Sequence, residues 1–146
     1  MLVDTNLLVY AAHPSADEHD DARSWLESRL ADADEGVVLC WPVLYAFLRL
    51  TTSARVLGEH ALGVRAAWES VAVFLGQPNA RVIGAGPLHE SIAGELAKTP
   101  GLRSDDVPDI ELAALAIEHG LVLASHDSGF RRFAALRTFD PLSASS

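Results

Sequence analysis

The sequence predicts an α/β domain built on a parallel sheet of about five strands. Two observations support this. Short apolar segments typical of buried strands alternate along the chain with longer amphipathic segments typical of helices. The chain of 146 residues is long enough for one domain with a sizeable core. We place a single domain at 1–142 and expect the tail 143–146 to fray.

The strand predictions rest on short apolar runs, which fit strands buried on both faces of a parallel sheet. No internal repeat, low-complexity tract or linker interrupts the alternation. The candidate strands are 1–4, 37–40, 81–83, 121–125 and 136–139.

Three helices are marked at their ends. Ser15 and Glu18 have the spacing of a capping box ahead of an apolar stripe, which predicts a helix after residue 15. A second helix opens at Trp41-Pro42, because proline is tolerated in a first turn. A third runs over 107–119 and ends at Gly120. Further helical segments are predicted at 60–75, 87–98 and 128–133.

Composition narrows the function. The net charge of −9 argues against a large basic surface for nucleic acid and favours a site that needs cations or a basic protein partner. Cys40 is the single cysteine, so no intrachain disulfide can form, as is usual in a reducing cytosol. Apolar runs such as 121–124 are too short to span a bilayer, and the N-terminus lacks the basic region of a secretory signal. We expect a cytoplasmic protein that does not enter a membrane.

Three aspartates are predicted to meet at one edge of the sheet. Asp4 ends the first strand, and Asp127 follows the fourth. Asp109 lies in the first turn of the helix that precedes the fourth strand. Because that helix runs antiparallel to the strand that follows it, its first turn lies near the same edge of the sheet. Ligands bind at the carboxyl ends of parallel strands. Three neighbouring carboxylates need a cation, and hard oxygen ligands favour Mg²⁺, with Mn²⁺ as a substitute.

Each aspartate also has a structural interpretation. Asp109 could complement the helix dipole, and Asp127 could cap a short helix beginning at Ser128. Asp4 is harder to explain in this way, because a carboxylate that ends a buried strand needs polar partners.

Several motifs, in one order from residue 1 to about 142, carry a family resemblance. They are Val3-Asp4-Thr5-Asn6, Trp41-Pro42 with 47–52, Pro108-Asp109 with 112–120, and Ser125-His126-Asp127 with Phe130. The set resembles the PIN-domain proteins and, more narrowly, the VapC toxins of bacterial toxin–antitoxin pairs. The resemblance implies a three-layer α/β/α sandwich and a magnesium-dependent endoribonuclease. It also implies an RNA substrate, a cognate VapB-like antitoxin that blocks the site, and commonly a toxin homodimer.

Within that resemblance, Asp4, Asp109 and Asp127 match the first, third and fourth acidic positions of the family and would be the catalytic and metal-binding residues. The second acid, usually a glutamate, is matched by Ala46. Either another acid serves, or the site is weaker, or the chain is a deactivated or engineered copy. Asp105 and Asp106 are the favoured substitutes. Glu111 is disfavoured because it stands two positions after Asp109, on another helix face.

Supporting roles are predicted for four residues. Thr5 and Asn6 could orient Asp4 or a metal-bound water, although Asn6 could equally cap a helix. Arg49 could contact a substrate phosphate or form a structural ion pair, and Asp106 could assist the metal.

Two further predictions concern side chains outside that set. Arg131 and Arg132 fit a solvated basic face better than an RNA contact, while the tryptophans fit core positions better than stacking platforms. The tryptophans are Trp25, Trp41 and Trp68.

The sequence thus predicts a toxin that cleaves RNA with water activated by a divalent metal. A catalytically attenuated PIN-fold module that keeps antitoxin binding is the alternative, supported by Ala46. A third hypothesis is that the chain is a metal-dependent hydrolase of DNA or small phosphoesters. The chain has neither a glycine-rich phosphate loop nor a Gly-x-Ser-x-Gly motif, which argues against a nucleoside triphosphatase and an α/β-hydrolase.

Overall fold

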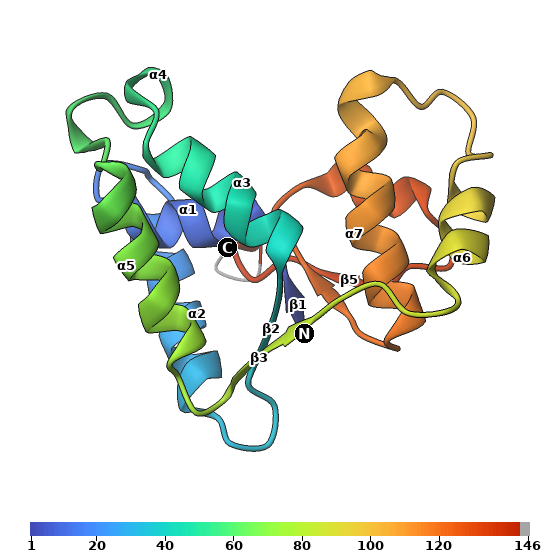
Figure 1. The fold of residues 1–146 in the computed structure, drawn as a ribbon, viewed down its shortest axis with the longest axis horizontal. Helices are drawn as coiled ribbons and strands as arrows, with labels where there is room; N and C mark the ends of the chain where they lie inside the picture. The colour runs from blue at the N-terminus through green and yellow to red at the C-terminus, as the bar shows by residue number, and fades with distance from the viewer. Residues whose placement is uncertain (144–146) are drawn as a thin grey trace.

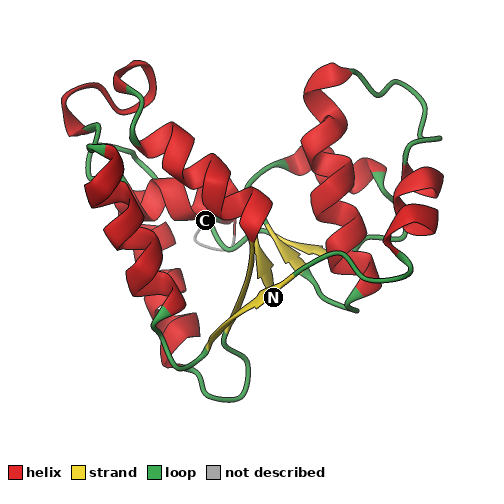
Figure 2. Ribbon diagram, in the orientation of Figure 1, coloured by secondary structure: helices red, strands yellow, loops and turns green. Residues whose placement is uncertain are grey.

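The computed structural model describes residues 1–143, and the last residues of the predicted tail, 144–146, lie outside them. Its centre is an all-parallel sheet of five strands in the order β3-β2-β1-β4-β5 (Figure 2). Each strand overlaps a predicted one, so the predicted sheet is confirmed. The strands are β1 (Leu2–Val3), β2 (Val37–Cys40), β3 (Ala80–Ile83), β4 (Leu123–Ala124) and β5 (Thr138–Phe139).

Helices cover both faces of the sheet, which confirms the three-layer α/β/α arrangement (Figure 1). On one side lie α1 (Thr5–Ala12), α2 (His19–Ala31), α3 (Trp41–Thr51), α4 (Ala54–Leu57) and α5 (Val64–Leu75). The other side holds α6 (His89–Leu96) and α7 (Val107–Glu118). Short 3₁₀ turns occupy η1 (Gly58–His60), η2 (Ser104–Asp106) and η3 (Ser128–Arg132). No helix of residues 1–143 is both long and apolar enough to cross a membrane.

The strand order places a topological switch point between β1 and β4. From the central β1, the chain adds β2 and β3 on one side and then crosses over to place β4 and β5 on the other. Leu2 pairs with Leu123 and Val3 with Ala124, so the two strands end level with one another. Ligands of open α/β sheets bind in the crevice at such a point.

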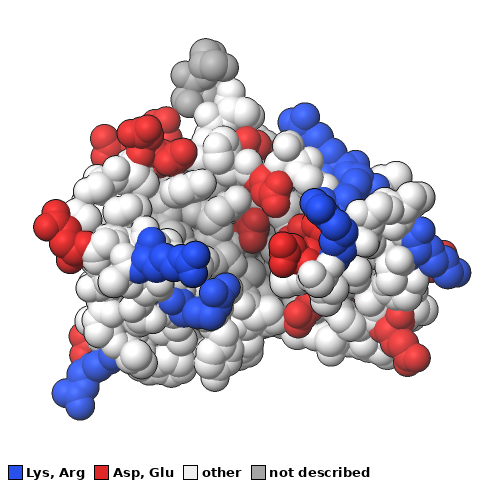
Figure 3. Space-filling model, turned by 90° about the horizontal axis from the view of Figure 1, so that it is seen from above, with Lys and Arg blue, Asp and Glu red and all other residues white. Residues whose placement is uncertain are grey.

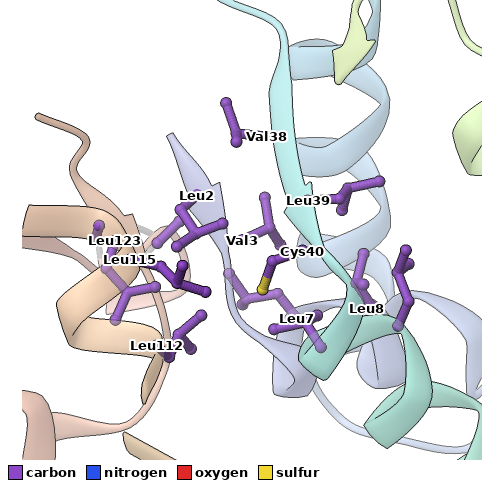
Figure 4. Packing of buried hydrophobic residues seen from close by; sticks show 14 of the residues in the cluster. Leu2, Val3, Leu7, Leu8, Val38, Leu39, Cys40, Leu112, Leu115 and Leu123 are labelled. Atoms are coloured by element: carbon purple, nitrogen blue, oxygen red, sulfur yellow. The ribbon is translucent and has the colours of Figure 1, made fainter. Parts of the chain in front are cut away.

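A continuous core fixes that register. Leu2 and Leu123 are fully buried, and α7 packs Leu112 and Leu115 toward them (Figure 4). Shortening such a leucine to alanine typically lowers the free energy of unfolding by about 2–5 kcal/mol. Packing therefore holds β1 in place even though the strand is only two residues long.

Two local predictions were wrong. The capping box does not form, because α2 begins at His19 and the Ser15 hydroxyl instead bonds His60 Nε2 at 2.8 Å. Trp41 and Trp68 do not lie in the core: they are 40% and 45% exposed, and their rings stack 6.3 Å apart. Ser15 thus bonds a residue 45 positions away and does not cap α2, and Trp41 stacks on a residue of another helix outside the core. Local spacing does not reveal contacts between segments so far apart in the sequence.

Candidate functional site

Asp4 lies at the switch point, as the residue that follows β1 and caps α1. One carboxylate oxygen, Oδ1, accepts the backbone N–H of Thr5 at 2.7 Å. The other, Oδ2, accepts the hydroxyl of Ser125 at 2.6 Å. Both oxygens are therefore held by donors, and the orientation of the carboxylate is fixed.

Ser125 links the ends of β1 and β4. Its buried hydroxyl donates to Asp4 and accepts the backbone N–H of Asp127 at 3.0 Å and the Asn6 side-chain amide at 3.4 Å. The sequence places Ser125 in a family motif but predicts no role for its side chain. The available signal was its position just after a strand that runs beside β1, which brings its side chain to the same edge.

Asp109, in the first turn of α7, pairs with an arginine from η3. Arg132 donates from one terminal nitrogen to Asp109 Oδ2 at 2.8 Å, and that nitrogen lies 3.3 Å from Asp106 Oδ1. The Arg132 guanidinium also lies over the ring of Phe133, 5.0 Å from its centre. The expectation of a solvated basic face was thus wrong for Arg132, which is an internal counter-ion of two aspartates.

Asp127 caps η3, as its structural interpretation predicted. Its Oδ1 accepts the backbone N–H of Gly129 at 2.8 Å. It borders a separate polar pocket of about 220 Å³ together with Ser125, Arg131 and Asp140. Asp127 therefore stands near the other two acids but faces a neighbouring space.

The three predicted aspartates nevertheless influence one another. Burial raises the pKa of Asp4, the Ser125 and Thr5 hydrogen bonds partly offset this, and the charges of Asp109 and Asp127 raise it further. Burial also raises the pKa of Asp109 above its ordinary value, against the lowering effect of Arg132. A cation placed among these groups would relieve both the desolvation and the repulsion.

Asp4 and Asp109 share a small cavity of about 80 Å³ between the first two turns of α3 and of α7. Thr5, for which a supporting role is predicted, lines it too. The remaining lining residues are Pro42, Val43, Ala46, Pro108, Glu111 and Leu112. Figure 3 shows this end of the molecule as a furrow with acidic side chains gathered along it and basic ones on both flanks.

The acids predicted to replace the missing glutamate do not line that cavity. Asp106 is occupied, since its Oδ2 accepts the backbone N–H of Arg103 and its Oδ1 faces Arg132. Asp105 is exposed and lies outside the cavity. Glu111, the substitute disfavoured from the sequence, is a lining residue. Arg49 lies on an exposed part of α3 and also outside the cavity.

The carboxylate oxygens at this site suit a hard cation that keeps its hydration shell. Within residues 1–143, no three His, Cys, Asp or Glu side chains stand close enough together to hold a metal ion by themselves. Magnesium usually keeps several waters and takes only one or two carboxylates directly. Two carboxylates, Asp4 and Asp109, on one cavity of about 80 Å³ fit that mode, whereas they do not fit a closed cage of the zinc type.

Comparison with known proteins identifies the family. The model of the PIN domain matches residues 1–136. Ribonuclease VapC33 of Mycobacterium tuberculosis is 37% identical over 142 residues, covering 97% of this chain and 98% of that protein. Ribonuclease VapC43 of the same organism is 38% identical over 142 residues, covering 97% and 95%. The chain belongs to the PIN-domain family and, within it, to the VapC ribonucleases of toxin–antitoxin pairs.

Solved structures agree on the fold. One is the structure of VapBC2 from Rickettsia felis bound to a DNA fragment from the VapBC2 promoter. It superposes with a TM-score of 0.69 at 20% identity, covering 94% of this chain and 96% of that one. VapC20 of Mycobacterium tuberculosis, a toxin that cleaves the sarcin–ricin loop, gives 0.66 at 21% identity, covering 89% and 92%.

Proposed function

We propose that this chain is the toxin of a type II toxin–antitoxin pair and acts as a magnesium-dependent endoribonuclease. The observation that carries the proposal is the shared cavity of Asp4 and Asp109 at the switch point of the sheet. Relatives of the chain such as VapC33 and VapC43 are named ribonucleases, and their similarity to it runs over nearly its whole length.

The chain's own residues have distinct roles in this proposal. Asp4 is a fixed anion, because Thr5 and Ser125 already hold its two oxygens. Asp109 uses Oδ2 for Arg132, while no described residue donates to its Oδ1, so that oxygen can orient or deprotonate a water. Mg²⁺, held by Asp4 and Asp109 with Asp127 nearby, would supply charge stabilisation to a phosphodiester under attack.

A second candidate is a PIN-fold module that has lost useful turnover but still binds its antitoxin. The observation that favours it is the wall formed by α3, which presents Pro42, Val43 and Ala46 to the cavity and no acid. In this second candidate function, the chain retains the fold and the surfaces that bind its partners, but it cleaves RNA slowly or not at all.

Cleavage of RNA tests the proposal. The purified chain is titrated with Mg²⁺ and with Mn²⁺, and cleavage of total bacterial RNA is followed beside Asp4→Asn. Asp17→Asn is the matched control, because Asp17 is an exposed carboxylate that does not line the cavity. Metal-dependent cutting by the parent and Asp17→Asn, and none by Asp4→Asn, is expected.

Two other outcomes separate the alternatives. A parent that binds metal and antitoxin but cuts no RNA and does not arrest growth would support the attenuated module. Preferential hydrolysis of DNA or a small phosphoester, in a substrate panel at fixed salt, would instead support the third hypothesis.

The antitoxin is proposed to bind an apolar groove of about 470 Å³ between α1, α2, α3 and α5. Phe47 and Phe74 form part of its floor, and the ion pair of Arg23 with Glu27 lies at its border. A groove of this kind accepts the apolar face of a partner helix.

We also propose a homodimer through an aromatic face formed by Trp41, Tyr45, Val64 and Trp68. These side chains are 40%, 62%, 72% and 45% exposed on α3 and α5. Clustered exposed aromatic and apolar side chains mark interaction surfaces, and aromatic residues are enriched at interface centres. Two separate surfaces would then serve the antitoxin and the second toxin.

A further inference from the structure

Two carboxylates of α7 border the cavity, although they stand two positions apart. Each residue of a helix turns by about 100°, so Pro108 and Leu112 lie near the centre of the arc that faces the cavity. Asp109 and Glu111 then lie at its two borders, roughly 160° apart. The spacing that prevents these side chains from pairing with one another lets them approach one cavity from opposite sides.

The Glu111 carboxylate is available to a ligand. Glu111 is exposed, and no hydrogen bond or ion pair joins its side chain to any residue of 1–143. Asp4, by contrast, has donors on both oxygens, and Asp109 has one on Oδ2. Glu111 is thus the carboxylate of this cavity that has both oxygens open.

The charge of Glu111 reaches the same region as that of Asp4. Cys40 ends β2 and is fully buried directly before the first turn of α3. Burial raises the pKa of its thiol to about 11, and the charges of Glu111 and Asp4 both add to that shift. Both charges therefore act on Cys40, the residue directly before the part of α3 that lines the cavity.

The facing wall offers no acid. From α3 the cavity receives only Pro42, Val43 and Ala46. The geometry points to Glu111 as the third carboxylate of the site, where it holds water around the divalent cation and replaces an acid that α3 lacks. This inference rests on the proposed function, since it concerns the same cation.

Binding of Mn²⁺, followed by electron paramagnetic resonance of the free ion, tests the assignment without relying on activity. Glu111→Gln should bind Mn²⁺ about 10- to 100-fold more weakly than the parent, the usual effect of losing a group that orients a metal's water. Asp105→Asn is the matched control, because Asp105 is an exposed carboxylate before α7 that lies outside the cavity, and it should bind like the parent.

A second variant tests the location. Adding Ala46→Glu to Glu111→Gln places a carboxylate on the opposite wall of the same cavity, and it should restore Mn²⁺ binding and RNA cleavage together. Absence of rescue in a folded double variant would overturn the shared location. Circular dichroism and thermal unfolding check that each variant folds.

The outcomes separate this inference from the proposed function. If Asp4→Asn abolishes Mn²⁺ binding while Glu111→Gln binds like Asp105→Asn, the assignment of Glu111 is wrong and the proposed site stands. If neither Asp4→Asn nor Glu111→Gln changes the binding of the parent, the cation site itself is wrong, and both fail.

Discussion

The hydroxyl of Ser125 donates to Asp4 Oδ2 at 2.6 Å, across a gap of 121 residues in the sequence. The contact exists because β1 and β4 run side by side and end level with one another. Ser125 also accepts from Asp127 and Asn6, so one buried hydroxyl positions groups from both strand ends. The geometry of the site thus depends on strand register as much as on the acids themselves.

Replacing Ser125 with alanine should destabilise the protein. The backbone N–H of Asp127 and the amide of Asn6 would lose their acceptor, and Asp4 would lose a donor. Leaving buried polar groups unpaired costs about 1–3 kcal/mol in the free energy of unfolding. Urea denaturation measures this loss. Ser128→Ala, at an exposed neighbouring serine, should behave like the parent, and equal effects of the two changes would refute the role of Ser125.

Arg132 should stabilise the metal-free site. Arg132→Ala removes the counter-ion of Asp109 and Asp106, and losing a hydrogen bond to a charged group costs about 1.5–3 kcal/mol. Added Mn²⁺ should then raise the unfolding temperature of this variant more than that of the parent, because the cation takes over the missing charge. Arg131→Ala, at an exposed arginine with no ion pair among residues 1–143, is the control.

A double-mutant cycle with Asp109→Asn identifies the partner. If the effects of Arg132→Ala and Asp109→Asn simply add, the pair makes no specific contribution to stability, and the prediction is wrong.

The pH dependence of the metal-free protein should show carboxylates acting in opposite directions. The pKa of Asp4 and of Asp109 is raised, so the folded state binds their protons more tightly than the unfolded state does. Their contribution to stability is therefore lost as the pH rises through the folded-state values. Glu118 accepts the backbone N–H groups of Gly86 and Leu88, which lower its pKa, and its contribution is lost as the pH falls.

Carbon-13 NMR titration of the side-chain carboxyls checks the signs directly. Asp4 and Asp109 should titrate above the ordinary aspartate value of about 3.9, and Glu118 below the ordinary glutamate value of about 4.3. Ser125→Ala should move the Asp4 midpoint further up, because it removes a donor to the ionised form. An Asp4 midpoint at or below the ordinary value would contradict this account of the site.

The sequence predicted the sheet and the meeting of Asp4 with Asp109, because both follow from local rules. Strand ends and helix starts are marked by nearby residues, and parallel topology brings them to one edge. The roles of Ser125 and Arg132 were missed because each depends on a contact between distant segments. Glu111 is disfavoured from the sequence because residues two positions apart on a helix do not contact one another. That rule concerns pairs of side chains, whereas the cavity spans an arc of α7 wide enough to include both Asp109 and Glu111.

The aromatic face should mediate self-association. Trp68 stacks on Trp41 at 6.3 Å while both stay partly exposed, so Trp68→Gln removes contact area without opening the core. Loss of an interface tryptophan commonly costs about 2 kcal/mol or more, which corresponds to a roughly 30-fold weaker dimer. Sedimentation equilibrium measures the change. Val73→Gln lies in the antitoxin groove and should weaken antitoxin binding while leaving the dimer intact. A parent that is monomeric at all concentrations, or a Trp68→Gln variant that dimerises as tightly as the parent, would show that this face does not mediate self-association.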